Sequence, residues 1–382
     1  MEISKKNDIV PSKWPRPVCD IGGPYSRWLR QRTALLSAMI LLFCNCHHAD
    51  RLSEAAHQSG GRSSADQTAS GQTPVGQVIT PIPFDEMNGN DVYNASGVIP
   101  IGDSRFLFCD NNSADALYEL DLKHNGRKKG SLIKHKIHGL APGAVSDFED
   151  LTSVKEKGRR FVFVTSSLSV KKAKKEEPSK IPSSGLLRVT IDHGDNLIAE
   201  NMADFRNWFV RQVPELTGVA EFPPEEGGIN IEGLAWDADR HALLFGLRAP
   251  VPNGKLLVVP VRVKSLTDRW TTDNLEVLPP IRLSIETTEG GQGIRSIEYI
   301  KSLGLFLIII GRSLSGSDVP FALYQWDGRQ SGMTKRLKLS FAKKMKPEGI
   351  CEGKVDGKRV LVFVDDSGGY QILSLDQVRL LL

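Results

Sequence analysis

Four glutamates occur at similar places in a repeated sequence pattern and could act together at one site. Each lies near the start of a short apolar run: "SDFEDLTSV" (Glu149), "NIEGLAWD" (Glu232), "IRSIEYI" (Glu298) and "KPEGICEG" (Glu348). In a fifth stretch, "NASGVIP", Ser96 or Asn94 takes this place. Carboxylate oxygens are preferred ligands of Ca²⁺, and carboxylates also pair with arginine through two hydrogen bonds. The pattern therefore predicts either a divalent-cation site or a set of ion pairs.

Further apolar runs follow each of these stretches in a constant order. The second runs are "RFLFCDN", "RFVFVTSS", "ALLFGLR", "LFLIIIGR" and "RVLVFVDD". The third runs are "ALYELDL", "GLLRVTID", "KLLVVPV", "FALYQWD" and "YQILSL". Short apolar runs separated by turn residues are typical of β-strands, and their recurrence indicates a repeat architecture.

Four of the five units also have a fourth run, in "SLIKHKI", "NLIAENM", "LEVLPPIRL" and "RLKLSF". The fifth unit reaches the end of the sequence without one, and "GQVITPIPF" near the start of the folded region could supply it. We therefore predict an all-β fold, a β-propeller of four-stranded antiparallel blades closed by an N-terminal strand. Five blades are expected, and the alternative is a sixth, degenerate blade between Glu149 and Glu232.

A propeller would gather the polar residues at one mouth of its central channel. The first strand of each blade starts at this mouth, and the antiparallel second strand returns to it. The metal-ligand candidates are Glu149, Glu232, Glu298 and Glu348, with Ca²⁺ as the expected ion. The candidates for binding a substrate are Arg248, Arg312, Asp110, Asn111 and Asp365. If no cation binds, Arg248 and Arg312 are expected to balance the glutamates.

The N-terminal part of the chain differs in composition from the rest. Residues 1–46 combine basic residues with the apolar run "ALLSAMILLFC", which is typical of a signal or leader segment. Residues 47–77 are rich in Ser, Gly and Gln and read as a disordered tether, so the propeller would span residues 78–382. We expect an exported protein, periplasmic or anchored to the outer membrane by a lipid on Cys44 or Cys46; a buried N-terminal helix is the alternative.

Charge and motifs exclude several classes of function. The net charge of +4 is carried by residues 1–46, so the folded region offers no basic surface for nucleic acid. No Gly-x-Ser-x-Gly elbow, P-loop or paired-cysteine zinc motif occurs. Cys109 and Cys351 are expected as buried thiols, with a disulfide as the alternative. We expect a monomer whose partner is a small-molecule substrate or a protein of the cell envelope.

The stretch "NIEGLAWDADRHALLFGLRAP", residues 230–250, resembles the signature of a bacterial family of uncharacterised propeller-like domains. "DFEDLT" and "KPEGIC" resemble its other blocks, and the resemblance covers roughly residues 78–382. More distantly, the chain is similar to esterase-like phytases and to gluconolactonase and paraoxonase propellers. That similarity implies a Ca²⁺ site that polarises a phosphate ester, carboxylic ester or lactone, hence a metal-assisted hydrolase. The alternative is a non-catalytic propeller that binds a ligand or protein.

Overall fold

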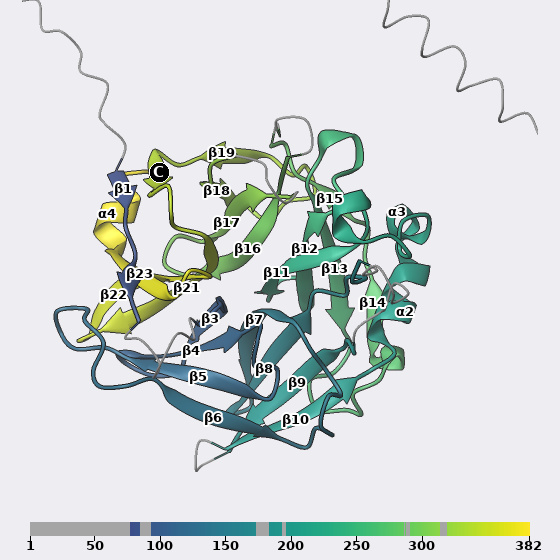
Figure 1. Cartoon of the computed structure of the whole chain (residues 1–382), viewed down its shortest axis with the longest axis horizontal. Helices are drawn as coiled ribbons and strands as arrows, with labels where there is room; N and C mark the ends of the chain where they lie inside the picture. Colours follow the sequence, from purple (N-terminus) through teal and green to yellow (C-terminus); the bar gives the residue numbers. More distant parts are fainter. Residues whose placement is uncertain are drawn as a thin grey trace, which may run out of the picture. The chain divides into compact units, whose positions relative to one another are not determined.

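The computed structural model describes residues 77–84, 93–172, 183–192, 196–285, 287, 291–313 and 319–382. The predicted leader, residues 1–46, and all of the predicted tether except Gln77 lie outside these residues. Most described elements are strands, and most of these strands are arranged in groups of four antiparallel neighbours (Figure 1). The predicted all-β propeller fold is therefore confirmed.

The first two blades follow the predicted order of runs. Blade 1 contains β3 (Ala95–Pro100), β4 (Arg105–Asp110), β5 (Ala116–Asp121) and β6 (Ile133–His138). Blade 2 contains β7 (Phe148–Glu156), β8 (Arg159–Ser166), β9 (Leu186–Ile191) and β10 (Leu197–Met202). The outermost strands β6 and β10 pair in parallel, so the two blades form one continuous eight-stranded sheet.

Three further blades complete the order. Blade 3 contains β11 (Asn230–Asp237), β12 (Ala242–Ala249), β13 (Leu257–Val263) and β14 (Leu275–Val277), and β15 (Ile281–Arg282) also pairs with β13. Blade 4 contains β16 (Gln292–Ile300), β17 (Leu305–Arg312), β18 (Ala322–Trp326) and β19 (Thr334–Arg336). Blade 5 contains β21 (Pro347–Val355), β22 (Lys358–Asp365), β23 (Gly369–Ser374) and β2 (Ile82–Pro83).

The first strands of these blades surround a common centre in Figure 1. Each packs against the first strand of the next blade, and β21 of blade 5 packs against β3 of blade 1. Within the described residues this ring of first strands is thus closed, and the eight-stranded sheet contributes two of its blades. Apolar side chains fill the space between adjacent blades: Phe163 of β8, for example, stacks on Trp236 of β11 at a centroid distance of 6.1 Å. The middle strands are apolar on both faces because a blade lies on each side.

The N-terminal strand β2 closes the ring as predicted from "GQVITPIPF". Ile82 and Pro83 pair antiparallel with Tyr370 and Gly369 of β23. The next residue, Phe84, is buried, and its ring stacks on Phe108 of blade 1 at a centroid distance of 5.2 Å. A second contact precedes β2, since β1 (Gln77–Ile79) pairs in parallel with β20 (Leu339–Phe341).

The helices are short and lie outside the sheets. They are α2 (Phe205–Gln212), α3 (Pro214–Thr217) and α4 (Leu375–Arg379), with 3-10 turns at η2 (Pro224–Glu226), η3 (Pro252–Gly254) and η4 (Thr272–Asn274). In α2, Phe205 and Phe209 are buried against Phe245 of blade 3, which gives this helix a packing role. No helix among the described residues is long and apolar enough to span a membrane.

Candidate functional site at the channel mouth

Each first strand carries a β-bulge near its start, and the bulged residues define the site. In each strand one residue has no partner across the ladder, and this happens at equivalent points in all five blades. These bulge residues are Gly97, Glu149, Glu232, Arg295 and Glu348. A bulge re-aims the side chain of its extra residue, and here four of the five side chains line one cavity.

The fourth bulge residue is an arginine, and it pairs with glutamates on both sides. Arg295 Nη1 lies 2.7 Å from Glu232 Oε2, and Arg295 Nη2 pairs with Glu348 Oε1. Arg248, at the end of β12, places Nη1 2.5 Å from Glu232 Oε1. Ser96 Oγ donates to Glu348 Oε2 at 3.2 Å. The carboxylates are thus neutralised by guanidinium groups from neighbouring strands.

Burial and pairing act in opposite directions on the two arginines. Loss of solvent lowers the pKa of Arg295, and Arg248 nearby lowers it further, against the opposing effect of Glu232. Burial also tends to lower the pKa of Arg248, but Glu232, with Glu149 and Glu225, outweighs it and the pKa of Arg248 is raised. Arginine stays protonated in proteins, so both groups are cations at physiological pH.

These carboxylates do not fit the expected Ca²⁺ site. The guanidinium group of Arg295 stands between Glu232 and Glu348, where an ion would need their oxygens. Both oxygens of Glu232 already face arginine nitrogens. The described residues contain no group of three or more His, Cys, Asp or Glu side chains arranged to hold a metal ion. The arrangement matches the arginine alternative, with Arg295 in the role expected of Arg312.

Glu149 is the exception among the glutamates. Its carboxylate forms no hydrogen bond or ion pair with any described residue, although its side chain is buried and lines the cavity. Burial raises the pKa of Glu149 well above its ordinary value, and the negative charges of Glu232 and Asp147 raise it further. Arg295 and Arg248 oppose this only in part. Glu149 is therefore suited to hold a proton and exchange it with a bound molecule.

The cavity at the mouth has a volume of about 340 Å³. Its lining residues are Asn111, Glu149, Glu232, Arg248, Arg295, Arg312, Phe321, Lys346, Glu348 and Asp366. Lys346 pairs with Asp366 at 3.0 Å, whereas the side chain of Arg312 forms no ion pair with a described residue. A neighbouring hollow of about 290 Å³ shares Glu149 and Arg248. Most charges in the cavity therefore belong to ion pairs, whereas the guanidinium group of Arg312 has no carboxylate partner among the described residues.

Asp110 and Asp365, which were predicted to bind a substrate, instead accept hydrogen bonds from backbone N–H groups. The buried carboxylate of Asp110 accepts the N–H of Asn112 at 2.8 Å, and that of Asp365 accepts the N–H of Lys346 at 2.6 Å. Burial raises the pKa of both Asp110 and Asp365. The structure therefore brings Arg248, Arg312 and Asn111 to the mouth, and it gives Asp110 and Asp365 structural positions.

Glu298 lies away from the mouth cavity, three residues beyond Arg295 along β16. It accepts a hydrogen bond from Thr152. Burial, and then the charge of Asp150, raise the pKa of Glu298 well above its ordinary value. The sequence contained a signal for the correct alignment. Four of the bulges read "FEDL", "IEGL", "IRSI" and "PEGI". Each has an apolar or proline residue, then a charged residue, then a small or acidic residue, then an aliphatic one. The charged second position aligns Arg295, not Glu298, with the glutamates of the other blades.

Asp150 follows Glu149 and connects three blades inside the channel. Its Oδ2 accepts the N–H of Leu234 at 2.8 Å and faces Ser296 Oγ at 3.4 Å. Burial nevertheless raises the pKa of Asp150 well above its ordinary value. From blade 1, Gly97 packs against this carboxylate with φ +52°, and a Cβ there would lie 2.3 Å from Asp150 Oδ1. Only glycine fits this place in the bulge ring.

The chain matches one known protein family over most of its length. A family model described as "Protein of unknown function (DUF3616)" matches residues 131–370. The chain belongs to this family. The resemblance of "NIEGLAWDADRHALLFGLRAP" to an uncharacterised family is thus supported at the level of the family. None of the curated proteins compared with this member of the DUF3616 family matches it.

Several solved structures resemble the fold of this DUF3616 member. One is a thermostable family-43 glycoside hydrolase (11% identity, 74% of this chain and 88% of that chain, TM-score 0.42). Another is a Cellvibrio cellulosa α-L-arabinanase (10% identity, 74% and 91%, TM-score 0.40). A third is an α-L-arabinofuranosidase from Lactobacillus brevis (9% identity, 74% and 90%, TM-score 0.40). Likeness at this level transfers no reaction or substrate. None of these three is a phytase or a lactonase.

Proposed function

We propose that the mouth cavity binds a small polar anion that bears a phosphate or carboxylate group. The observation that carries this proposal is that Arg312 forms no ion pair with any described residue, in a cavity whose other cations are paired with carboxylates. An anion that enters can contact Arg312 without breaking an existing ion pair. The 340 Å³ volume falls within the range of about 300–1,000 Å³ common for small-molecule sites.

The binding proposal is tested by titration with inorganic phosphate and with acetate, followed by isothermal calorimetry. Saturable binding is expected, weakened about tenfold or more in Arg312→Gln, because a charge-assisted contact is lost. Lys338→Gln is a matched control, since Lys338 is an exposed cation outside the cavity. Equal affinities in the wild type and Arg312→Gln, or no binding of either anion, would contradict the proposal.

A second candidate is hydrolysis of a phosphate ester, carboxylic ester or lactone at the same cavity. It is favoured by Glu149, a carboxyl that faces the cavity without a partner and whose pKa is raised. In this mechanism Arg312 and Arg248 would orient the substrate, and protonated Glu149 would give its proton to the leaving oxygen while water attacks. The chemistry relies on arginine in place of the Ca²⁺ ion first expected.

The enzyme hypothesis is tested with p-nitrophenyl phosphate and p-nitrophenyl acetate. Turnover is expected to fall about 100-fold or more in Glu149→Gln, the usual effect of losing a general acid, and to persist in chelator. Phosphate binding without turnover of either ester would leave the site a non-catalytic ligand-binding one. Loss of turnover in chelator would instead favour a metal-assisted reaction.

We further propose that the protein is exported and works in the cell envelope as a monomer. The support is the basic and apolar composition of residues 1–46 followed by the Ser- and Gly-rich stretch. Cell fractionation of the full chain tests this, with the periplasm or outer membrane as the expected location. Recovery in the cytoplasm at full length would contradict it.

A further inference from the structure

A second cavity lies between blades 1 and 2, away from the channel mouth. Blades of a propeller diverge from the centre outward, but here β6 and β10 pair in parallel at the outer edge, with Leu197 opposite Ile137 and Ile198 opposite His138. Residues from both blades line a cleft of about 510 Å³ on this sheet. The cleft is larger than the mouth cavity and shares no lining residue with it.

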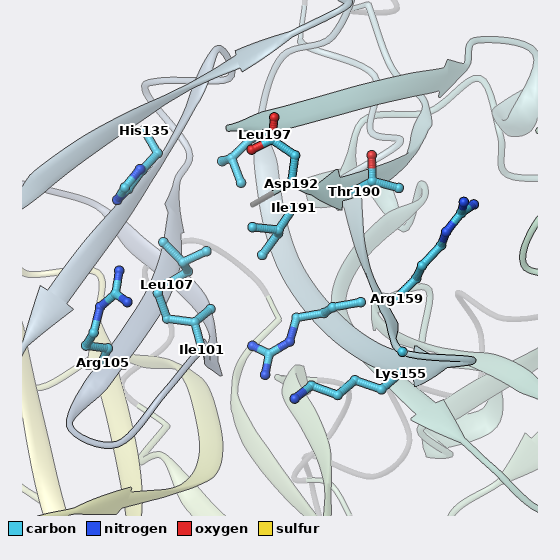
Figure 2. Close-up of a pocket in the computed structure, with 12 residues that line it drawn as sticks. Ile101, Arg105, Leu107, His135, Lys155, Arg159, Thr190, Ile191, Asp192 and Leu197 are labelled. Atoms are coloured by element: carbon cyan, nitrogen blue, oxygen red, sulfur yellow. The ribbon is translucent and has the colours of Figure 1, made fainter. Parts of the chain in front are cut away.

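The cleft has an apolar floor with polar groups on its sides. Figure 2 shows Arg105 and His135 on one side and Lys155 and Arg159 on the other. The apolar side chains between them are Ile101, Leu107, Ile191 and Leu197. Leu107 and Leu197 are buried, whereas Ile101 and Ile191 are partly exposed. An apolar surface of this kind inside a polar rim is typical of small-molecule sites.

The basic side chains on the two sides of the cleft differ in whether a carboxylate pairs with them. On the blade 1 side, Glu119 accepts from both Arg105 at 2.6 Å and His135 at 2.8 Å. On the blade 2 side, no carboxylate among the described residues pairs with Lys155, Arg159 or Arg160. The cleft is therefore positive on the blade 2 side.

Two further polar groups border the cleft. Arg160 donates from Nη1 to the carbonyl of Pro100 at 2.6 Å, which fixes its guanidinium group between the blades. Burial lowers the pKa of Arg160, although it remains a cation. Asp192, the acidic residue of the lining, accepts from the backbone N–H and the side chain of Asn196. The blade 2 side of the lining thus carries the three cations Lys155, Arg159 and Arg160 against the single carboxylate of Asp192.

We propose that this cleft binds a small organic anion, with its charged group against Lys155, Arg159 and Arg160 and its apolar part on Ile101, Leu107 and Ile191. The charge selects a phosphate or carboxylate, and the floor selects a short aliphatic or aromatic substituent. Neither element depends on the proposed function of the mouth cavity. The enclosure between two blades favours a free small molecule over a flat membrane surface.

The test compares hexyl phosphate with inorganic phosphate by calorimetry in the Arg312→Gln protein, so that the mouth cavity contributes little. Saturable binding of hexyl phosphate is expected, at least tenfold tighter than that of inorganic phosphate. The double variant Lys155→Gln/Arg159→Gln is expected to weaken binding about tenfold or more. Both side chains are exposed, so folding should be unaffected.

Lys358→Gln provides a matched control. Lys358 occupies the same place in the β21–β22 hairpin of blade 5 as Arg159 does in the β7–β8 hairpin, and it is also exposed. This variant should bind hexyl phosphate like its parent. Equal binding in the double variant, or no preference for hexyl phosphate over phosphate, would overturn the proposal. So would binding only to vesicles that contain phosphatidic acid.

Discussion

Replacing Arg295 with methionine would remove the cation that separates Glu232 from Glu348. The side chain of Arg295 is 8% exposed, and the two carboxylates are 3% and 5% exposed. Removing one partner of a buried ion pair costs about 3–5 kcal/mol, because the other charge stays buried and unbalanced. The folded unit has about 300 residues. At about 2.1 cal/mol/K of unfolding entropy per residue, the melting temperature should fall by roughly 5–8 °C.

Urea and thermal unfolding at neutral pH would measure this effect. Arg329→Met is the control, since Arg329 pairs with Asp327 but is 82% exposed, and it should change stability by less than about 0.5 kcal/mol. Adding Glu348→Gln to Arg295→Met should restore part of the loss, because one of the unbalanced charges is then absent. A loss below about 1 kcal/mol for Arg295→Met, or strict additivity with Glu348→Gln, would refute the view that this arginine balances the ring.

Three further predictions concern the channel and its closure. Because the pKa of Glu149 is raised in the folded state, ionisation of Glu149 destabilises the fold as pH rises through that pKa. Glu149→Gln should therefore raise the melting temperature at pH 8, and this difference should disappear near pH 4. A difference that does not depend on pH would contradict this. Gly97→Ala should destabilise the fold by more than about 2 kcal/mol, because the new Cβ would clash with Asp150. The control Gly130→Ala, also at positive φ but with open space around it, should cost only about 1–2 kcal/mol. Equal losses of stability in urea unfolding would count against the clash. Phe84→Ala should lower the free energy of unfolding by about 3–5 kcal/mol, because it removes a buried ring between blades 5 and 1. Phe222→Ala is the control, since Phe222 is 48% exposed. Similar stabilities of the two variants in thermal unfolding would argue against this role of Phe84.

The blade order could be predicted because it depends on local features. Each strand is a short apolar run between turn residues, and burial between neighbouring blades makes runs such as "LFLIII" apolar on both faces. The closing strand was also predictable, since the fifth unit lacked a fourth run and "GQVITPIPF" offered one. These conclusions require only the period of the pattern, not the position of any side chain.

The site was harder to predict because a bulge changes which residue faces the channel. Charge alone predicts Glu298 as the counterpart of Glu232, but the extra residue of β16 is Arg295, three positions earlier. The error reversed the sign of one charge in the ring and so favoured a metal ion. The parallel pairing of β6 and β10 could not be read from sequence either, because it joins two polar outer strands through tertiary contact alone.

The closure by β2 has a consequence for how the chain reaches its native state. The residues that pair with Ile82 and Pro83 lie in β23, close to the other end of the sequence. During synthesis Ile82 and Pro83 lack this partner strand until β23 has emerged. Loop closure over such a distance carries a large entropic cost and slows folding. Loss of β23 should therefore release β2 as well and leave two sheet edges open to aggregation.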